Sequence, residues 1–175
     1  MHHVQRTGWG NMIGGVAERS YEPLDLADLA AITSFAMRSL GAVFDRARVA
    51  ALYRDRLLLL ALAQGSALHY LDGTNGIKDF DVWAFFEAGP GKPFPHRKRW
   101  CTDLGPSRFG RHPGDAGYSG RRLDLMGRSI EVVRGENAED AVRRWLASSA
   151  RSAVALRQKP VFCLFPESSF GKRIN

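Results

Sequence analysis

Two aspartates, Asp79 and Asp81, stand two positions apart within residues 77–86, a run rich in aromatic and β-branched side chains. Such a run is typical of a β-strand. Because side chains alternate between the two faces of a strand, both carboxylates would project from one face and Phe80 and Val82 from the other. Two like charges on one face repel each other, and strands disfavour Asp. A bound divalent cation would offset this cost, since carboxylate oxygens are ligands that Mg²⁺ prefers.

A third carboxylate, Asp124, lies between Leu123 and Leu125 in a second predicted strand, residues 121–126. If the two strands are neighbours, Asp79, Asp81 and Asp124 converge on one edge of the sheet. Three carboxylates are a ligand set for two metal ions about 3.5–4 Å apart, which can clamp an in-line phosphoryl displacement. The sequence therefore predicts a site for two Mg²⁺ ions, with these three residues as its ligands.

A candidate phosphate-binding corner precedes the aspartates. Residues 57–63 are continuously apolar and predict a buried strand, which Gly65 and Ser66 follow at the start of a helix. Glycine lets the backbone approach a phosphate closely, and the first turn of a helix presents unpaired N–H groups to an anion. The Ser66 hydroxyl would add another donor. Lys78 and Arg122, one or two positions from the predicted metal ligands, are expected to contact the same phosphates.

The order of these residues resembles the nucleotidyltransferase superfamily of the DNA polymerase β type. Its motif is a Gly-Ser or Gly-Gly pair, then a carboxylate–apolar–carboxylate strand, then a later carboxylate; here it covers roughly residues 43–126. The resemblance implies that Gly65 and Ser66 hold a nucleoside triphosphate, that Asp79 and Asp81 bind both metals, and that Asp124 completes the catalytic metal site. It also implies transfer of a nucleoside monophosphate to a hydroxyl acceptor with release of pyrophosphate. The segment of about 36 residues before Asp124 is longer than in the family's minimal members.

Residues 87–122 carry eight Lys and Arg against three acidic residues, most of the net charge of +7 of the whole chain. They also hold five of the eight prolines, so the sequence predicts a long, mostly irregular loop. Basic side chains lie next to the aromatic Trp100 in residues 96–100, a pattern suited to nucleic-acid contact. The loop is expected to border the cleft and to hold an RNA or small-molecule acceptor.

Two alternatives to an active enzyme remain open at this point. The first is an inactive protein of nucleotidyltransferase-like fold that binds nucleotide or RNA through the basic loop. The second is a nucleic-acid-binding protein in which the acidic strand residues are incidental. Three converging carboxylates beside a phosphate site count against the second, because they would repel a nucleic-acid backbone.

The elements around the motif predict a mixed α/β domain. Apolar periodicity, together with residues that start or end helices, predicts helices over 25–40, ended by Gly41, and over 43–54. Residues 121–126 and 129–133 are expected to form a hairpin across Gly127. A helix is expected from Asn137 towards 158, and a last strand over 161–165. Residues 1–20 are expected to be a loose arm and 21–175 a single domain. Two cysteines and no apolar run longer than 57–63 predict a cytoplasmic protein with no membrane partner.

Overall fold

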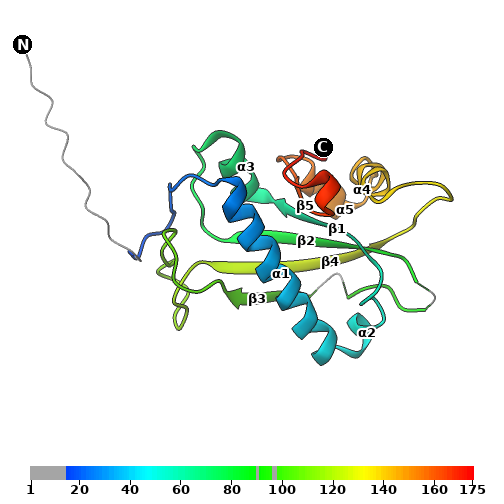
Figure 1. The fold of residues 1–175 in the computed structure, drawn as a ribbon, viewed down its shortest axis with the longest axis horizontal. Coiled ribbons are helices and arrows are strands. Elements are labelled where there is room, and N and C mark those ends of the chain that lie inside the picture. Colours follow the sequence, from blue (N-terminus) through cyan, green and yellow to red (C-terminus); the bar gives the residue numbers. More distant parts are fainter. Residues whose placement is uncertain (1–14, 90, 96–97) are drawn as a thin grey trace, which may run out of the picture.

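The computed structural model describes residues 15–89, 91–95 and 98–175 (Figure 1). Its helices are α1 (Leu26–Arg46), α2 (Arg48–Ala51), α3 (Gln64–Asp72), α4 (Ala138–Leu146), α5 (Arg151–Leu156) and the 3₁₀ turn η1 (Glu167–Ser169). Its strands are β1 (Leu57–Ala63), β2 (Phe80–Glu87), β3 (Arg99–Asp103), β4 (Arg122–Ile130) and β5 (Phe162–Phe165). Most of the predicted arm, residues 1–14, lies outside the described residues.

The five strands form one mixed sheet in the order β3-β4-β2-β1-β5. The pairs β1·β2, β1·β5 and β3·β4 are antiparallel, whereas β2 and β4 run parallel. The predicted combination of α-helices and a mixed sheet is therefore confirmed. The predicted apolar strand over 57–63 is β1 itself, and the predicted acidic strand is β2, which begins at Phe80 and so leaves Asp79 on the bend just before it.

Helices cover the two faces of the sheet unequally. On one face, α1 crosses the strands and buries residues such as Leu29, Ile32 and Leu40 against Val82 and Leu125. On the other face, α4 and α5 pack on the β1 side of the sheet, and their cluster draws its strand residues from β1, β2, β4 and β5. Asp81 and Asp124 belong to this second face, near the beginnings of β2 and β4.

Helix α1 differs from the prediction, because it does not end at Gly41 but continues to Arg46. A glycine inside a helix costs about 1 kcal/mol relative to alanine, and the buried neighbours Val43 and Phe44 offset that cost. Asp25 begins the helix with a capping box that includes Asp28. By length and composition, α1 is the one helix in the described part of the chain that could cross a membrane. Core helices pass the same test, and α1 packs an apolar side on the sheet.

One prediction about β-structure after β2 was wrong. The hairpin across Gly127 does not form, because Arg122–Ile130 is a single strand that pairs with β2 from Leu123 to Ile130. Gly127 serves packing instead: a Cβ atom there would lie 2.1 Å from Cε1 of Phe94. The described part of segment 87–122 is mostly irregular, as predicted, apart from the edge strand β3, which was not predicted.

The C-terminal region begins and ends as predicted but is divided in the middle. The Asn137 side chain accepts a hydrogen bond from the backbone N–H of Asp140 and so caps α4. The predicted single helix is broken after Leu146, and α5 resumes at Arg151. The last predicted strand is confirmed as β5.

The end of the predicted loose arm is tied to the domain. Ser20 and Ile77 exchange two backbone hydrogen bonds of 2.9 and 2.7 Å. Arg121, which is fully buried, donates to the carbonyl oxygens of Glu18, Lys78 and Phe109. Residues 15–20 therefore pack against the segments that precede β2 and β4.

Candidate functional site

The predicted site lies along one row that crosses four strands. Asp81 of β2 is the register partner of Ala63 of β1 on one side and of Asp124 of β4 on the other, and Asp124 pairs in turn with Cys101 of β3. Neighbouring strands lie about 4.8 Å apart. The condition set by the sequence, that the two aspartate-bearing strands are neighbours, is therefore met, and the row brings Asp81 and Asp124 together beside the end of β1.

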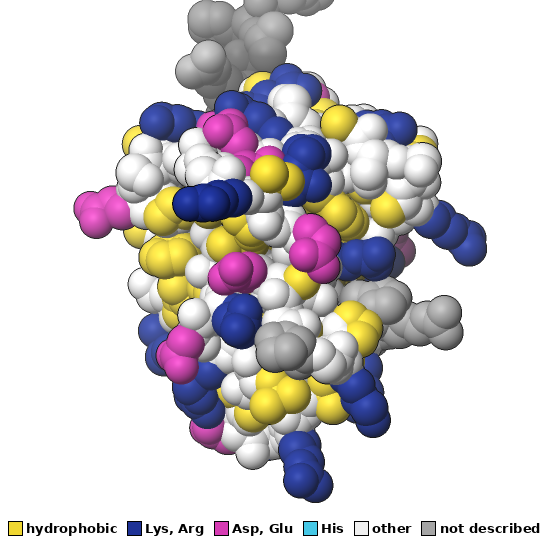
Figure 2. All heavy atoms as spheres, turned by 90° about the vertical axis from the view of Figure 1, so that its right-hand side faces the viewer, with side chains coloured by type: hydrophobic (Ala, Val, Ile, Leu, Met, Phe, Trp, Pro, Cys, Tyr) yellow, Lys and Arg dark blue, Asp and Glu magenta, His cyan; other side chains and the backbone are white. Residues whose placement is uncertain are grey.

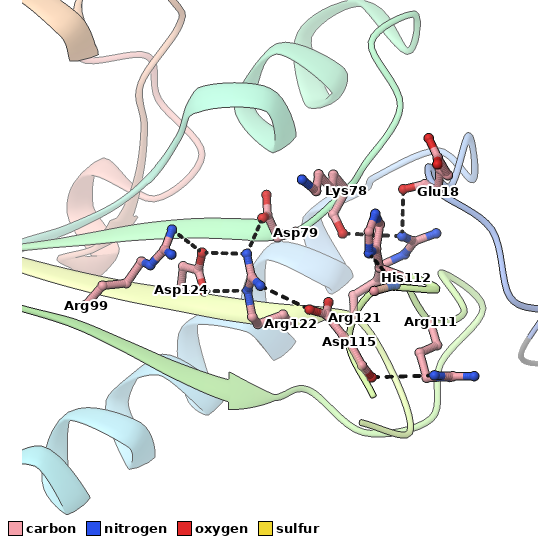
Figure 3. Close-up of polar contacts among 11 residues, drawn as sticks. Glu18, Lys78, Asp79, Arg99, Arg111, His112, Asp115, Arg121, Arg122 and Asp124 are labelled. Atoms are coloured by element: carbon pink, nitrogen blue, oxygen red, sulfur yellow. Dashed lines mark hydrogen bonds and ion pairs between the residues drawn. The ribbon is translucent and has the colours of Figure 1, made fainter. Parts of the chain in front are cut away.

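Arg122 holds two of the three predicted carboxylates (Figure 3). Its Nη2 lies 2.8 Å from Oδ2 of Asp79, and its Nε lies 2.7 Å from Oδ1 of Asp124. Its Nη1 lies 3.0 Å from Oδ1 of Asp115, a residue of the segment between β3 and β4. From β3, Nη1 of Arg99 lies 3.2 Å from the other oxygen of Asp124.

These contacts compensate the cost of burying the charges. The side chain of Asp124 is only 1% exposed and that of Arg122 is 22% exposed. Burial lowers the pKa of Arg122, but the hydrogen bond to Asp124 and the charges of the three carboxylates outweigh it and raise the pKa above its ordinary value. The sequence predicted that Arg122 contacts phosphate. In this structure, its guanidinium instead forms ion pairs with carboxylates.

Asp81 is the aspartate of the row that has no hydrogen bond or ion pair among the described residues. Burial raises its pKa to about 7, and the charges of Asp79 and Asp124 add to this effect. Arg99 and Lys159 oppose it without cancelling it. A buried carboxylate that is disfavoured in its charged form, and that faces other carboxylates, is chemically prepared to receive a cation or a proton.

The Gly65–Ser66 corner adjoins the row at the end of β1. Gln64 turns the chain into α3 with a φ of 56°, in the left-handed region that non-glycine residues rarely adopt. A Cβ atom on Gly65 would lie 3.0 Å from Nδ2 of Asn75, whose amide donates to the Gly65 carbonyl. The Ser66 side chain is fully buried and donates to the carbonyl of Ala63, so its hydroxyl proton points into the protein rather than towards a phosphate.

A cavity of about 230 Å³ joins the corner to the aspartates. It is lined by Arg19, Gln64, Gly65, Asn75, Lys78, Asp79, Asp81 and Lys159. Lys78 was singled out from the sequence, and it projects beside Asp79 (Figure 3). Arg19 and Lys159 were not, because each is an isolated basic residue far along the chain from the motif. Cationic and anionic side chains thus lie together at the N-terminal end of α3, an arrangement suited to a phosphate group bound to a metal ion.

The three carboxylates do not surround one point at present. Among the described residues, no three His, Cys, Asp or Glu side chains are grouped so as to hold a metal ion. The donor types suit Mg²⁺, and Asp81 has no competing partner. The guanidinium of Arg122, however, lies between Asp79 and Asp124. The donor types of the three aspartates are therefore suited to metal ions, and Asp81 and Asp124 are in register, but Arg122 now occupies the space between Asp79 and Asp124.

The basic residues of segment 87–122 are divided among several roles. Arg99 and Arg122 reach the carboxylates, whereas Arg121 is buried against backbone carbonyls. Arg108 pairs with Asp28 of α1. On the face drawn in Figure 2, Lys and Arg side chains are scattered among acidic and apolar ones rather than gathered in one patch. None of the described residues of segment 87–122 lines the cavity, so the segment meets the predicted site only through Arg99 and Arg122 at the carboxylates, and its binding of an acceptor stays a prediction.

His69 of α3 has a structural role. Its Nδ1 accepts a hydrogen bond from the backbone N–H of Gly76, so Nε2, 3.0 Å from the carbonyl oxygen of Glu22, carries the proton and donates.

In comparisons with family models, with curated proteins and with solved structures, no match was found for the chain. The chemistry of the site itself therefore carries the functional interpretation.

Proposed function

We propose that the protein is a nucleotidyltransferase, which moves a nucleoside monophosphate from a nucleoside triphosphate to a hydroxyl acceptor and releases pyrophosphate. The observation that carries this proposal is the pairing of Asp81 with Asp124 on parallel neighbouring strands, with the cavity and the Gly65 corner beside them. The position of Asp79, on the bend before β2, also supports the proposal. Nη2 of Arg122 donates hydrogen bonds to both Asp79 and Asp124, so these two carboxylates lie close together.

Asp79, Asp81 and Asp124 would hold two Mg²⁺ ions. When bound, such ions orient the reacting phosphate and neutralise charge on the attacking and leaving oxygens. The carboxylates supply the negative charge for this, and the parallel register of β2 and β4 keeps Asp81 and Asp124 at a fixed spacing. Because the acceptor hydroxyl attacks directly, no side-chain nucleophile is needed, and positioning contributes much of the rate.

The triphosphate would enter the cavity of about 230 Å³ from the side of α3. Backbone N–H groups in the first turn of α3 have no partner within the helix and favour an anion. Lys78, Lys159 and Arg19 add positive charge on the same cavity wall. Gly65 keeps the backbone accessible, since a side chain there would point at Asn75. The Ser66 hydroxyl gives its proton to the carbonyl of Ala63 and is fully buried, so we assign it a structural role in the turn rather than contact with the triphosphate.

A second candidate is a nucleotidyltransferase-like protein that binds nucleotide or RNA without turnover. The observation that favours it is that Asp124 already forms ion pairs with two arginines, Arg122 and Arg99, which neutralise its charge. Under this candidate the ion pairs are permanent and the cluster has a structural role. Nucleotide would still bind at Gly65, but its affinity would not depend on a divalent cation.

Equilibrium binding distinguishes the two candidates. We expect calorimetric titration to detect a nucleoside triphosphate in Mg²⁺ and to lose that signal in EDTA. Asp81→Asn should abolish the Mg²⁺-dependent part, whereas Asp55→Asn, an exposed carboxylate outside the cavity, should leave it unchanged. Binding that is equal in Mg²⁺ and in EDTA would favour the inactive binder.

A further inference from the structure

Arg122 touches three carboxylates with three different nitrogens. Nη2 faces Asp79, Nε faces Asp124 and Nη1 faces Asp115, at 2.8, 2.7 and 3.0 Å. A guanidinium offers its donors in a rigid planar fork, which suits several carboxylates at once. With a side chain only 22% exposed, this arginine is a fixed part of the cluster rather than a solvated surface group.

The same contacts occupy the oxygens that a metal ion would use. Oδ1 of Asp124 lies against Nε of Arg122, and its Oδ2 lies 3.2 Å from Nη2 of Arg122 and 3.2 Å from Nη1 of Arg99. Oδ2 of Asp79 is the acceptor of the shared Nη2. A divalent cation cannot bind these oxygens directly while the guanidinium stays in place, because both cations need the same lone pairs and repel each other.

Asp115 offers Arg122 a place to remain after such a displacement. It is not one of the predicted metal ligands, and it belongs to the segment that joins β3 to β4. Its side chain is 10% exposed, so its charge is also shielded from water. If Nη2 and Nε leave the other two aspartates, the ion pair between Nη1 and Asp115 can persist, and Arg122 need not enter the solvent.

We infer that Arg122 is a built-in counterion which competes with divalent cations for Asp79 and Asp124, and that Asp115 retains the arginine when a cation displaces it. This inference rests on the proposed function only in taking these aspartates as metal ligands. It gives Arg122 a role opposite in sign to that of a phosphate-binding arginine: removing it should strengthen metal binding rather than weaken ligand binding.

Two substitutions should therefore change Mn²⁺ affinity in opposite directions. Arg122→Gln removes the competitor and should tighten Mn²⁺ binding by about tenfold, within the 5- to 150-fold range typical of coupled sites. Asp115→Asn removes the retaining partner, leaves the arginine to the other two carboxylates and should weaken Mn²⁺ binding several-fold. Arg111→Gln is the matched control, since among the described residues the Arg111 side chain donates to the backbone carbonyl of Asp115, at 3.5 Å, and pairs with none of the carboxylates; it should leave the affinity unchanged.

Free Mn²⁺ measured by electron paramagnetic resonance, on the full chain without nucleotide, gives these affinities. Thermal melts in EDTA would run beside it, and Arg122→Gln should melt lower than the wild type because it removes the ion pair of Asp79 and leaves the buried Asp124 with Arg99 alone. If Arg122→Gln does not fold, Arg122→Lys keeps the charge but loses the fork, and it should still bind Mn²⁺ more tightly than the wild type.

Each result bears on the inference in a distinct way. Weaker or unchanged Mn²⁺ binding in a folded Arg122 variant would overturn it, even if the wild type binds Mn²⁺ and nucleotide as proposed. A wild type and variants that all fail to bind Mn²⁺ would overturn it together with the metal site. Tighter binding in Arg122→Gln would support it, even if no nucleotidyl transfer were ever detected.

Discussion

Asp81→Asn should stabilise the metal-free protein, and the gain should grow with pH. Burial and the neighbouring carboxylates raise the pKa of Asp81 to about 7 in the folded chain, from the ordinary value of 3.8 for an aspartate. Between these two values the unfolded chain gives up a proton that the folded chain keeps, so the stability of the wild type falls as the pH rises from about 4 to 7. Above pH 7 the folded carboxylate is also charged, and the loss is complete.

The magnitude follows from the size of the shift. About three pKa units at 1.36 kcal/mol each give an upper limit near 4 kcal/mol at pH 8. At pH 5 the folded Asp81 is protonated and resembles the amide of asparagine, and only about 1.5 kcal/mol of the loss has accrued. The stability difference between Asp81→Asn and the wild type should therefore widen by about 2–3 kcal/mol from pH 5 to pH 8. For a chain of this length, this is several degrees in Tm.

Denaturant and thermal unfolding in EDTA at the two pH values measure this difference. Asp55→Asn, which changes an exposed carboxylate, controls for the loss of one charge. The reasoning would be refuted if Asp81→Asn were less stable than the wild type at pH 8, or if its advantage were the same at pH 5. In excess Mg²⁺ and nucleoside triphosphate the order should reverse, because the wild type alone keeps the full set of ligands.

Three further substitutions test the frame around the site. Arg121→Met should lower the free energy of unfolding by about 3 kcal/mol, because three backbone carbonyls lose a buried charged donor; a loss below about 1 kcal/mol in urea titration would show that the buried arginine is dispensable. Gly127→Ala should cost about 1–3 kcal/mol by overpacking, and Phe94→Leu in the same chain should restore part of it, whereas additive losses would contradict the 2.1 Å approach. For Asp103, burial raises the pKa, but hydrogen bonds from backbone N–H groups and a hydroxyl outweigh it and lower the pKa to about 2. Asp103→Asn should therefore lower Tm at pH 7, and this effect should fade as the pH falls from about 4 to 2; a constant effect would exclude the carboxylate's charge as its cause.

Local signals in the sequence were sufficient for the centre of the fold. The apolar run that forms β1 and the alternation around Asp81 are properties of adjacent residues, so their strands could be predicted without tertiary information. The meeting of Asp81 with Asp124 could be predicted only on condition that their strands are neighbours. The register between β2 and β4 meets that condition.

Glycine was misinterpreted where packing decided its role. Gly41 and Gly127 were both taken as ends of elements, yet one lies inside α1 and the other inside β4. In each case burial of the neighbouring apolar residues, or the approach of Phe94, outweighs the intrinsic cost of glycine.

The edge strand β3 was not predicted, because its composition is polar. It is a strand because β4 supplies its hydrogen-bonding partner, which only the tertiary fold provides.

The partners of the charged residues could not be predicted, because they come from distant parts of the chain. Arg122 was expected to face phosphate, but Asp79, 43 positions earlier, and Asp115 lie within its reach. Lys159 lines the cavity from the segment before β5, and no local pattern marks it. A short motif can identify a set of ligands, whereas the ion pairs that occupy them are determined by the tertiary fold.

The most direct measurement of the central claim uses nucleoside triphosphates labelled either at the α- or at the γ-phosphate. The protein would be incubated with each in Mg²⁺ and with pooled RNA or a small-molecule extract as a source of acceptors. Nucleotidyl transfer predicts that the α-label enters an acceptor while the γ-label is released as pyrophosphate, and that Asp81→Asn abolishes both. Transfer of the γ-label to an acceptor, or retention of both labels in intact triphosphate with every nucleotide, would contradict the claim.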